Sequence, residues 1–126
     1  MDRAGFARWL DAYRDAWRSN DRAEIEALFS DDAHYRYSPY GDPEVGARQI
    51  ADSWLDEPDS PDSWEAEYRP LAIDGDTYVA IGESRYPGEQ KSYSNIFVCK
   101  FDDAGRCREF TEWWMEKKAE AVPAGG

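Results

Sequence analysis

The sequence predicts an α+β fold in which helices cover one face of an antiparallel sheet. Two observations carry this prediction: apolar residues recur at helical spacing early in the chain, and they alternate at strand spacing in the remainder. The 126 residues suffice for one hydrophobic core. We therefore expect a single domain over residues 1–118, followed by a disordered tail over residues 119–126.

Three helices are predicted ahead of the long strands. The first covers residues 3–18, with its apolar stripe on Phe6, Trp9, Leu10, Tyr13 and Trp17. The second begins after Asp21, which stands three residues before Glu24 in the spacing of a capping box. The third covers residues 46–55 and places Ile50 and Trp54 four residues apart on one face.

Strand patterns follow each other through the rest of the chain, and they span residues 33–38, 64–73, 77–86, 93–101 and 106–115. Residues 39–43 form a turn-rich loop, and the acidic, proline-rich residues 56–63 form a solvated one. The run Asp74-Gly75-Asp76 predicts a hairpin turn, and residues 102–105 predict another.

The last hairpin places a polar pair on one face of the sheet. If its turn takes four residues, then Tyr93, Asn95 and Phe97 face Trp114, Glu112 and Phe110. An amide and a carboxylate would then lie among aromatic rings. A buried carboxylate costs several kcal/mol unless it is neutralised or hydrogen-bonded, and catalysis is one reason for a fold to keep it. Ser84 gives a weaker signal for the same face, which it would share with Ala80 and Gly82.

The chain is strongly acidic, with a formal net charge of -12. Such a surface repels nucleic acid and anionic membranes, so neither is expected as a partner; solubility alone also accounts for the charge. No apolar run approaches the ~20 residues of a membrane-spanning helix, and the first residues lack a signal pattern. We therefore expect a cytoplasmic protein.

The two cysteines agree with that compartment. In the predicted hairpin, Cys99 lies opposite Arg108 and Cys107 lies opposite Lys100. The two thiols would point to opposite faces of the sheet, where no disulfide can form.

Metal and nucleotide chemistry have no support in the sequence. The single histidine, His34, cannot form a usual zinc or iron site, and no acidic cluster has ligand spacing. Gly-rich phosphate loops and the G-x-S-x-G motif are missing. We predict that the protein uses no cofactor and no metal.

Several segments resemble one superfamily. Residues 20–33, the pair Ser38-Pro39, residues 46–50, residues 74–76 and residues 101–106 are similar to the NTF2-like fold in its SnoaL-like branch. The resemblance implies a cone, in which a bent antiparallel sheet wraps three helices around a hydrophobic pocket, often in a homodimer. The superfamily includes isomerases, cyclases, dehydratases, epoxide hydrolases and non-catalytic binders.

The steroid-isomerase branch of this superfamily uses a tyrosine and a protonated aspartate as oxyanion donors, with a second aspartate as base. Aligned without gaps on this chain, the donor tyrosine falls on Tyr13, the base on Tyr37 and the second donor on Phe97. One of the three positions therefore matches, and the steroid-isomerase mechanism itself is not predicted.

We select Glu112 as the candidate general acid or base, Asn95 as its orienting partner, and Tyr13 or Tyr37 as the group that stabilises negative charge. Structural roles are open alternatives: Glu112 bonded to Asn95 or Arg108, and tyrosines that only pack. The predicted substrate-binding walls are Trp17, Trp54, Tyr93, Phe97, Phe110 and Trp114. Core packing alone would explain these rings equally well.

Three functions remain open at this point. The first is a cofactor-independent cyclase, dehydratase or isomerase that acts on a small apolar molecule with a carbonyl or hydroxyl group. The second is a non-catalytic module that binds a small hydrophobic ligand. The third is a structural dimer whose cone is filled with rings. A homodimer is expected through the outer sheet face, which carries Val79, Ile81, Ile96, Val98, Thr111 and Trp113.

Overall fold

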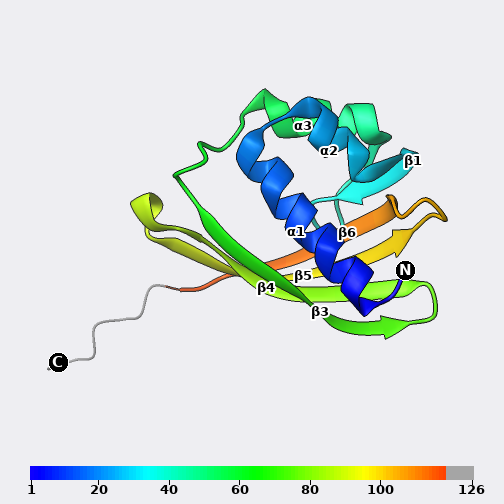
Figure 1. The fold of residues 1–126 in the computed structure, drawn as a ribbon. Helices are drawn as coiled ribbons and strands as arrows, with labels where there is room; N and C mark the ends of the chain where they lie inside the picture. The colour runs from blue at the N-terminus through cyan, green and yellow to red at the C-terminus, as the bar shows by residue number, and fades with distance from the viewer. Residues whose placement is uncertain (119–126) are drawn as a thin grey trace, which may run out of the picture.

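A computed structural model of the chain describes residues 1–118 and confirms the α+β architecture (Figure 1). Its elements are α1 (Arg3–Ser19), α2 (Arg22–Ala27), β1 (Phe29–Arg36), β2 (Glu44–Val45), α3 (Ala47–Asp56), β3 (Glu65–Asp74), β4 (Thr77–Tyr86), the 3-10 turn η1 (Pro87–Glu89), β5 (Lys91–Phe101) and β6 (Cys107–Glu116). The tail predicted to be disordered lies outside the described residues. No helix within the described part combines the length and apolar character needed to cross a membrane.

The six strands form one curved, open sheet in the order β2-β1-β6-β5-β4-β3. The long strands β3 to β6 pair antiparallel with their neighbours in the chain, as predicted. β1 instead pairs parallel with β6. These two strands are far apart in the chain, so no hairpin dictates their relative direction.

Helix α1 packs across the concave face of the long strands (Figure 1). It begins at the N-cap Asp2, whose carboxylate accepts a hydrogen bond from the Gly5 N–H at 2.7 Å. It ends at Asn20, which takes the left-handed conformation with φ of 55°. The buried stripe follows the predicted spacing and consists of Phe6, Trp9, Leu10, Tyr13 and Ala16. The core therefore lies between this stripe and the sheet.

The register of the last hairpin differs from the predicted one by two residues. Asn95 lies opposite Trp114, and Phe97 lies opposite Glu112. Two features cause the difference. The turn takes five residues instead of four, so Phe101 pairs with Cys107 rather than Arg106, and a β-bulge then adds one residue to β6, so Lys100 pairs with Glu109. Because two residues are one full strand period, the side chains of β6 beyond the bulge keep their predicted face.

The longer turn corrects the prediction for the cysteines. Cys99 and Cys107 are both fully buried in the same core, and the Cys107 thiol donates to the Glu109 carbonyl oxygen at 3.1 Å. Both are free thiols. Their expected placement on opposite faces assumed a four-residue turn, and the fifth turn residue brings Cys107 opposite Phe101, on the face of Cys99.

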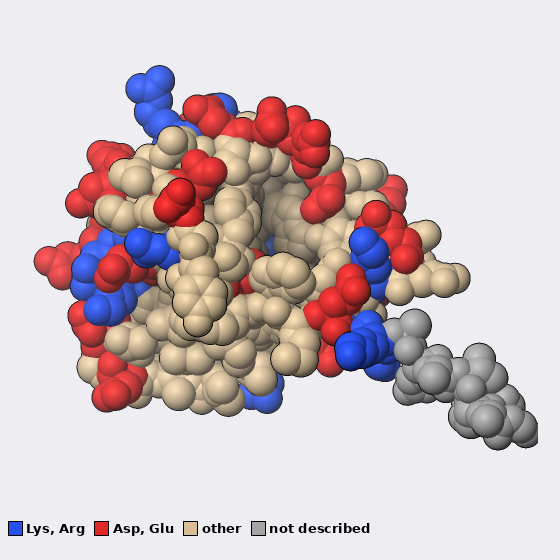
Figure 2. All heavy atoms as spheres, turned by 180° about the vertical axis from the view of Figure 1, so that it is seen from behind, with Lys and Arg blue, Asp and Glu red and all other residues tan. Residues whose placement is uncertain are grey.

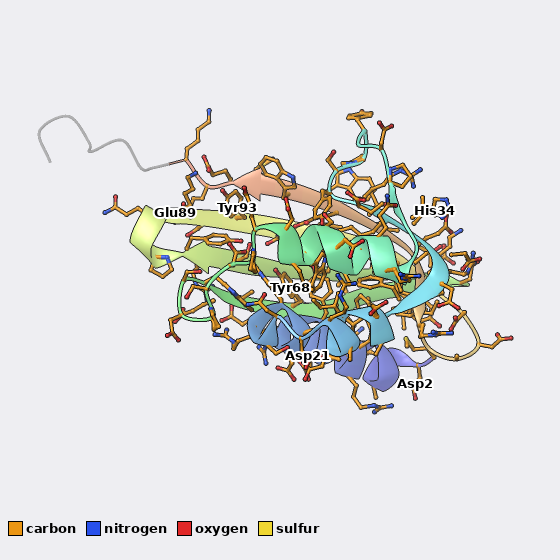
Figure 3. The ribbon with its side chains drawn as sticks, turned by 90° about the horizontal axis from the view of Figure 1, so that it is seen from above. Asp2, Asp21, His34, Tyr68, Glu89 and Tyr93 are labelled. Carbon is orange, nitrogen blue, oxygen red and sulfur yellow. The ribbon has the colours of Figure 1, made fainter. Side chains whose placement is uncertain are left out.

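Gly82 makes room for a large ring inside the sheet. A Cβ atom on Gly82 would lie 2.0 Å from the Glu67 carbonyl oxygen and 2.5 Å from Cδ1 of Tyr68. Tyr68 pairs with Gly82 across β3 and β4 and packs on Phe97 with ring centroids 4.6 Å apart. Figure 3 shows Tyr68 among the side chains between helices and sheet. Only glycine permits this close approach.

Candidate active site

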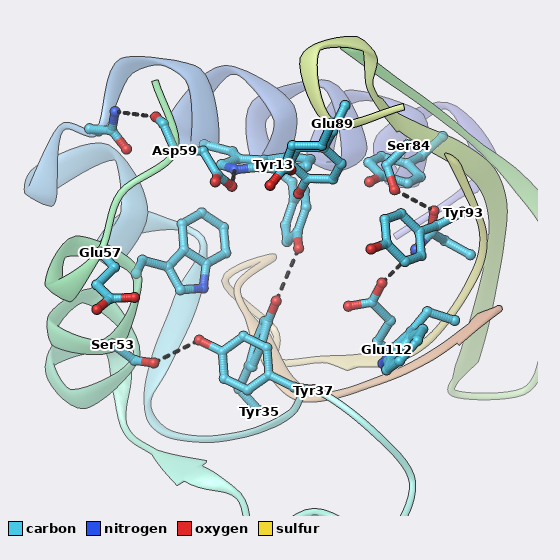
Figure 4. Close-up of a pocket in the computed structure, with 17 residues that line it drawn as sticks. Tyr13, Tyr35, Tyr37, Ser53, Glu57, Asp59, Ser84, Glu89, Tyr93 and Glu112 are labelled. Atoms are coloured by element: carbon cyan, nitrogen blue, oxygen red, sulfur yellow. Dashed lines mark hydrogen bonds between the residues drawn. The ribbon is translucent and has the colours of Figure 1, made fainter. Parts of the chain in front are cut away.

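A cavity of about 520 Å³ lies between the helices and the concave face of the sheet (Figure 4). It is open, which the filled-cone alternative does not allow. Eight of the ten residues selected from the sequence line it, namely Tyr13, Trp17, Tyr37, Trp54, Tyr93, Asn95, Glu112 and Trp114. They come from α1, α3, the end of β1, β5 and β6, so no single segment builds the site.

Phe97 and Phe110 do not line the cavity, although both were selected as walls. Each is 1% exposed, and each packs against the ring of Tyr13, at centroid distances of 5.4 Å and 5.6 Å. They form the layer beneath the cavity, because the tyrosine that covers them extends farther toward the cavity. Phe97 and Phe110 therefore influence a ligand indirectly, because they hold the ring of Tyr13 in place.

Glu112 is held by a short chain of polar groups. Asn95 Nδ2 donates to Glu112 Oε2 at 2.6 Å, and Ser84 Oγ donates to Asn95 Oδ1 at 3.0 Å. Because of the longer turn and the bulge together, Asn95 and Glu112 are diagonal rather than direct neighbours across the strands, a distance that long side chains still span. Asn95 and Ser84 are 3% and 4% exposed, so the amide has one orientation that satisfies both partners.

The environment of Glu112 shifts its ionisation. Burial raises the pKa of this carboxyl from 4.5 to about 7, and the hydrogen bond from Asn95 opposes the rise. At neutral pH, both the carboxylic acid and the carboxylate are therefore populated. A group with that property can accept and return a proton at physiological pH.

A pair of tyrosine hydroxyls forms the second polar feature of the cavity. The hydroxyls of Tyr13 and Tyr35 lie 3.0 Å apart and are buried. The Tyr35 ring stacks on Phe110, with centroids 4.4 Å apart and an interplanar angle of 2°. Burial, and then the field of neighbouring groups including Glu112, raises the pKa of both tyrosines well above the usual value. Both remain neutral hydrogen-bond donors at neutral pH.

Tyr37 lies nearer to solvent than this pair. Its side chain is 41% exposed, and its hydroxyl hydrogen-bonds to Ser53 Oγ of α3 at 2.7 Å. Burial of part of the ring raises its pKa. The contact joins the end of β1 to α3 beside Trp54, so Tyr37 forms part of the cavity mouth.

Several lining residues were not selected from the sequence. Tyr35 stands two residues before Tyr37, so the two side chains share one strand face. This spacing was sufficient to predict that Tyr35 also lines the cavity. The others are Asn20, Ser53, Glu57, Asp59, Tyr68, Tyr86 and Glu89. Glu57, Asp59 and Glu89 stand in a loop and a short turn, which have no periodicity from which a direction could be predicted.

The described residues contain no group of three or more His, Cys, Asp or Glu side chains that could hold a metal ion. His34 is exposed, at the end of the molecule away from Glu89 and Tyr93 (Figure 3). It does not line the cavity.

Comparison with known proteins agrees with the predicted family. The family described as SnoaL-like domain matches residues 10–110. No curated protein matches the chain. An NTF-2 like protein of unknown function from Burkholderia xenovorans is 17% identical, with a TM-score of 0.72, and the match covers 94% of this chain and 89% of that one.

Two further solved structures have names that suggest activities. An LEH-like epoxide hydrolase from M. tuberculosis is 16% identical, with a TM-score of 0.67 and coverage of 91% and 86%. A candidate ketosteroid isomerase from Kribbella flavida is 18% identical, with a TM-score of 0.70 and coverage of 98% and 87%. Likeness at this level of identity establishes the cone fold alone and confirms the NTF2-like prediction.

Proposed function

The chain belongs to the SnoaL-like domain family, and from this premise we propose that it is a cofactor-independent acid–base enzyme. Its substrate would be a small, largely apolar molecule with a carbonyl or hydroxyl group, and its reaction an isomerisation, dehydration or cyclisation. The observation that carries the proposal is Glu112, whose pKa of about 7 matches proton transfer at neutral pH and which lines an open cavity.

Glu112 would move the proton, and Asn95 would position it. Asn95 donates its hydrogen bond to Oε2 of Glu112. Among residues 1–118 no hydrogen bond reaches Oε1 of Glu112, so that oxygen is available to a substrate. Ser84 fixes the amide so that its N–H group, not its oxygen, points at the carboxylate. A base held from one side keeps its reactive oxygen in place through the reaction.

The tyrosine pair would stabilise the negative charge that develops on a substrate oxygen. When one of the two hydroxyls donates to the other, the second hydroxyl still has its proton to donate. A buried donor aimed at developing charge acts strongly because water does not compete with it. Tyr37 would supply a further hydroxyl at the mouth of the cavity.

The neighbouring structures named as an epoxide hydrolase and as a candidate isomerase support a catalytic use of this fold, without indicating which reaction occurs here. The base position of the steroid-isomerase pattern falls on Tyr37, which is not a carboxylate. The proton would instead be taken by Glu112, which lies on β6.

The test compares Glu112→Gln with wild type for both binding and turnover, on ligands identified by mass spectrometry of molecules that copurify with the protein. We expect kcat to fall at least about 100-fold while affinity is largely retained. The matched control is Glu109→Gln, which changes a half-buried carboxylate on the same strand with Lys100 and Arg108 as partners. Ligand binding without turnover by wild type would favour the binding module instead, and full activity of Glu112→Gln would refute the role of Glu112.

We also propose a homodimer through the outer face of the sheet. Trp113 is 45% exposed there and lies opposite Ile96, which in turn pairs with Ile81. An apolar face of this kind is usually covered by a partner. In analytical ultracentrifugation we expect wild type to sediment as a dimer and Trp113→Lys to sediment as a monomer.

The two free cysteines fit a reducing compartment such as the cytoplasm.

A further inference from the structure

The lining of the cavity has a one-sided charge. It includes four carboxylates, on Glu57, Asp59, Glu89 and Glu112, and no Lys, Arg or His. Figure 2 shows a hollow in one face of the molecule with Asp and Glu side chains around it. An anionic ligand would meet repulsion from every ionised group in this lining.

Two of these carboxylates have no compensating partner. Within residues 1–118, no hydrogen bond or ion pair engages the side chain of Glu57 or Glu89. Asp59 accepts one hydrogen bond, from Trp17 Nε1 at 3.1 Å. Elsewhere on the protein, acidic groups meet arginines, as Asp52 meets Arg22. Glu57 and Glu89 are exposed at the cavity mouth, so solvent alone surrounds their charge and a cationic ligand can approach them.

The fields of three carboxylates converge on one ring. Burial raises the pKa of the Tyr86 hydroxyl, and Asp59, Glu112 and Glu89 each raise it further. These groups come from the loop after α3, from β6 and from η1, so acidic side chains reach the cavity from three sides.

Aromatic rings border the same corner. Tyr86 and Tyr93 meet edge to face with centroids 6.0 Å apart and an angle of 89°. Tyr93 and Trp114 meet in the same way, at 5.9 Å and 82°. All three rings line the cavity. Ring faces attract ammonium groups, and mutually perpendicular rings can contact one such group from several sides.

We propose that the ligand of this cavity carries a protonated amine or a quaternary ammonium group. The cation would lie against Tyr86, Tyr93 and Trp114, beside Glu89 and Asp59. The remainder of the ligand, with its carbonyl or hydroxyl group, would extend toward the Tyr13–Tyr35 pair. This inference deepens the proposed function by naming a substrate class, and it rests on the same cavity.

The experiment uses three molecules with one skeleton and different charge: phenethylamine, phenethyl alcohol and phenylacetate. Each is titrated calorimetrically into the full chain at neutral pH and low salt. We expect the amine to bind at least about tenfold more tightly than the alcohol, with phenylacetate weakest. Added salt should weaken the binding of the amine and leave the binding of the alcohol unchanged.

The double variant Asp59→Asn/Glu89→Gln should lose most of the preference for the amine and keep the affinity for the alcohol, since asparagine can still accept the hydrogen bond from Trp17. Glu65→Gln/Glu83→Gln changes net charge equally, at two exposed residues beside Arg85 on the outer face, and should keep the preference.

Equal binding of amine and alcohol, no binding of the amine, or an equal loss in both double variants would overturn the proposal. None of these results touches the role of Glu112, which the turnover of Glu112→Gln tests separately. A preference for amines combined with full activity of Glu112→Gln would refute the enzyme mechanism and keep the ligand class.

Discussion

Replacing Glu112 by Gln should change how folding stability depends on pH. The pKa of this carboxyl is 4.5 when exposed and about 7 in the fold. Between these two values the unfolded chain releases a proton that the folded chain keeps, so wild-type stability falls as pH rises. Below about pH 4.5 and above about pH 7 the contribution is constant. Glutamine does not titrate, so the variant lacks this fall.

The size of the effect follows from the same two values. A pKa difference of this size corresponds to about 3 kcal/mol, and we expect about 2 kcal/mol because the carboxylate keeps some contact with water. Urea unfolding followed by tryptophan fluorescence, from pH 4 to pH 8, measures it. As pH rises across this range, the free energy of unfolding of Glu112→Gln should increase by about 2 kcal/mol relative to wild type. The free energy of unfolding of Glu109→Gln should follow that of wild type. Parallel curves for wild type and Glu112→Gln would refute the burial of Glu112.

Three further predictions concern the supporting residues. Asn95→Ala removes the hydrogen bond that opposes the pKa rise of its carboxyl partner, so that pKa should climb above about 7 in a carbon-detected NMR titration; a lower value would contradict the assignment. Tyr13→Phe and Tyr35→Phe each break a buried hydroxyl pair 3.0 Å apart and should cost about 1 kcal/mol, with a double variant that costs less than the sum, by denaturant unfolding. Gly82→Ala should cost more than about 2 kcal/mol, because its Cβ would overlap the neighbouring strand, whereas Gly88→Ala, with open space around it, should change stability by less than about 0.5 kcal/mol in the same assay.

Strand faces could be predicted because they depend on a local period of two. Asn95 and Glu112 lie on the concave face as expected, even though they are not directly opposite. The pairing itself could not be predicted, since the fifth turn residue and the bulge that together shift it depend on how the turn and the core fit together. The fifth turn residue also brings Cys107 to the side of Cys99. The register shifted by two residues, which is one full strand period, and Asn95 and Glu112 still lie on the same face and form their hydrogen bond.

The sequence by itself determined the helices, the long strands and the side of the sheet on which the acid and amide lie, because each follows from spacing within one segment. The tertiary structure alone decided that the hydroxyls of Tyr13 and Tyr35 meet, since they come from a helix and a strand with no local relation. It also decided that Glu57, Asp59 and Glu89 surround one cavity. Loops take their direction from the elements that they join, and that direction exists only once the sheet has curved around α1.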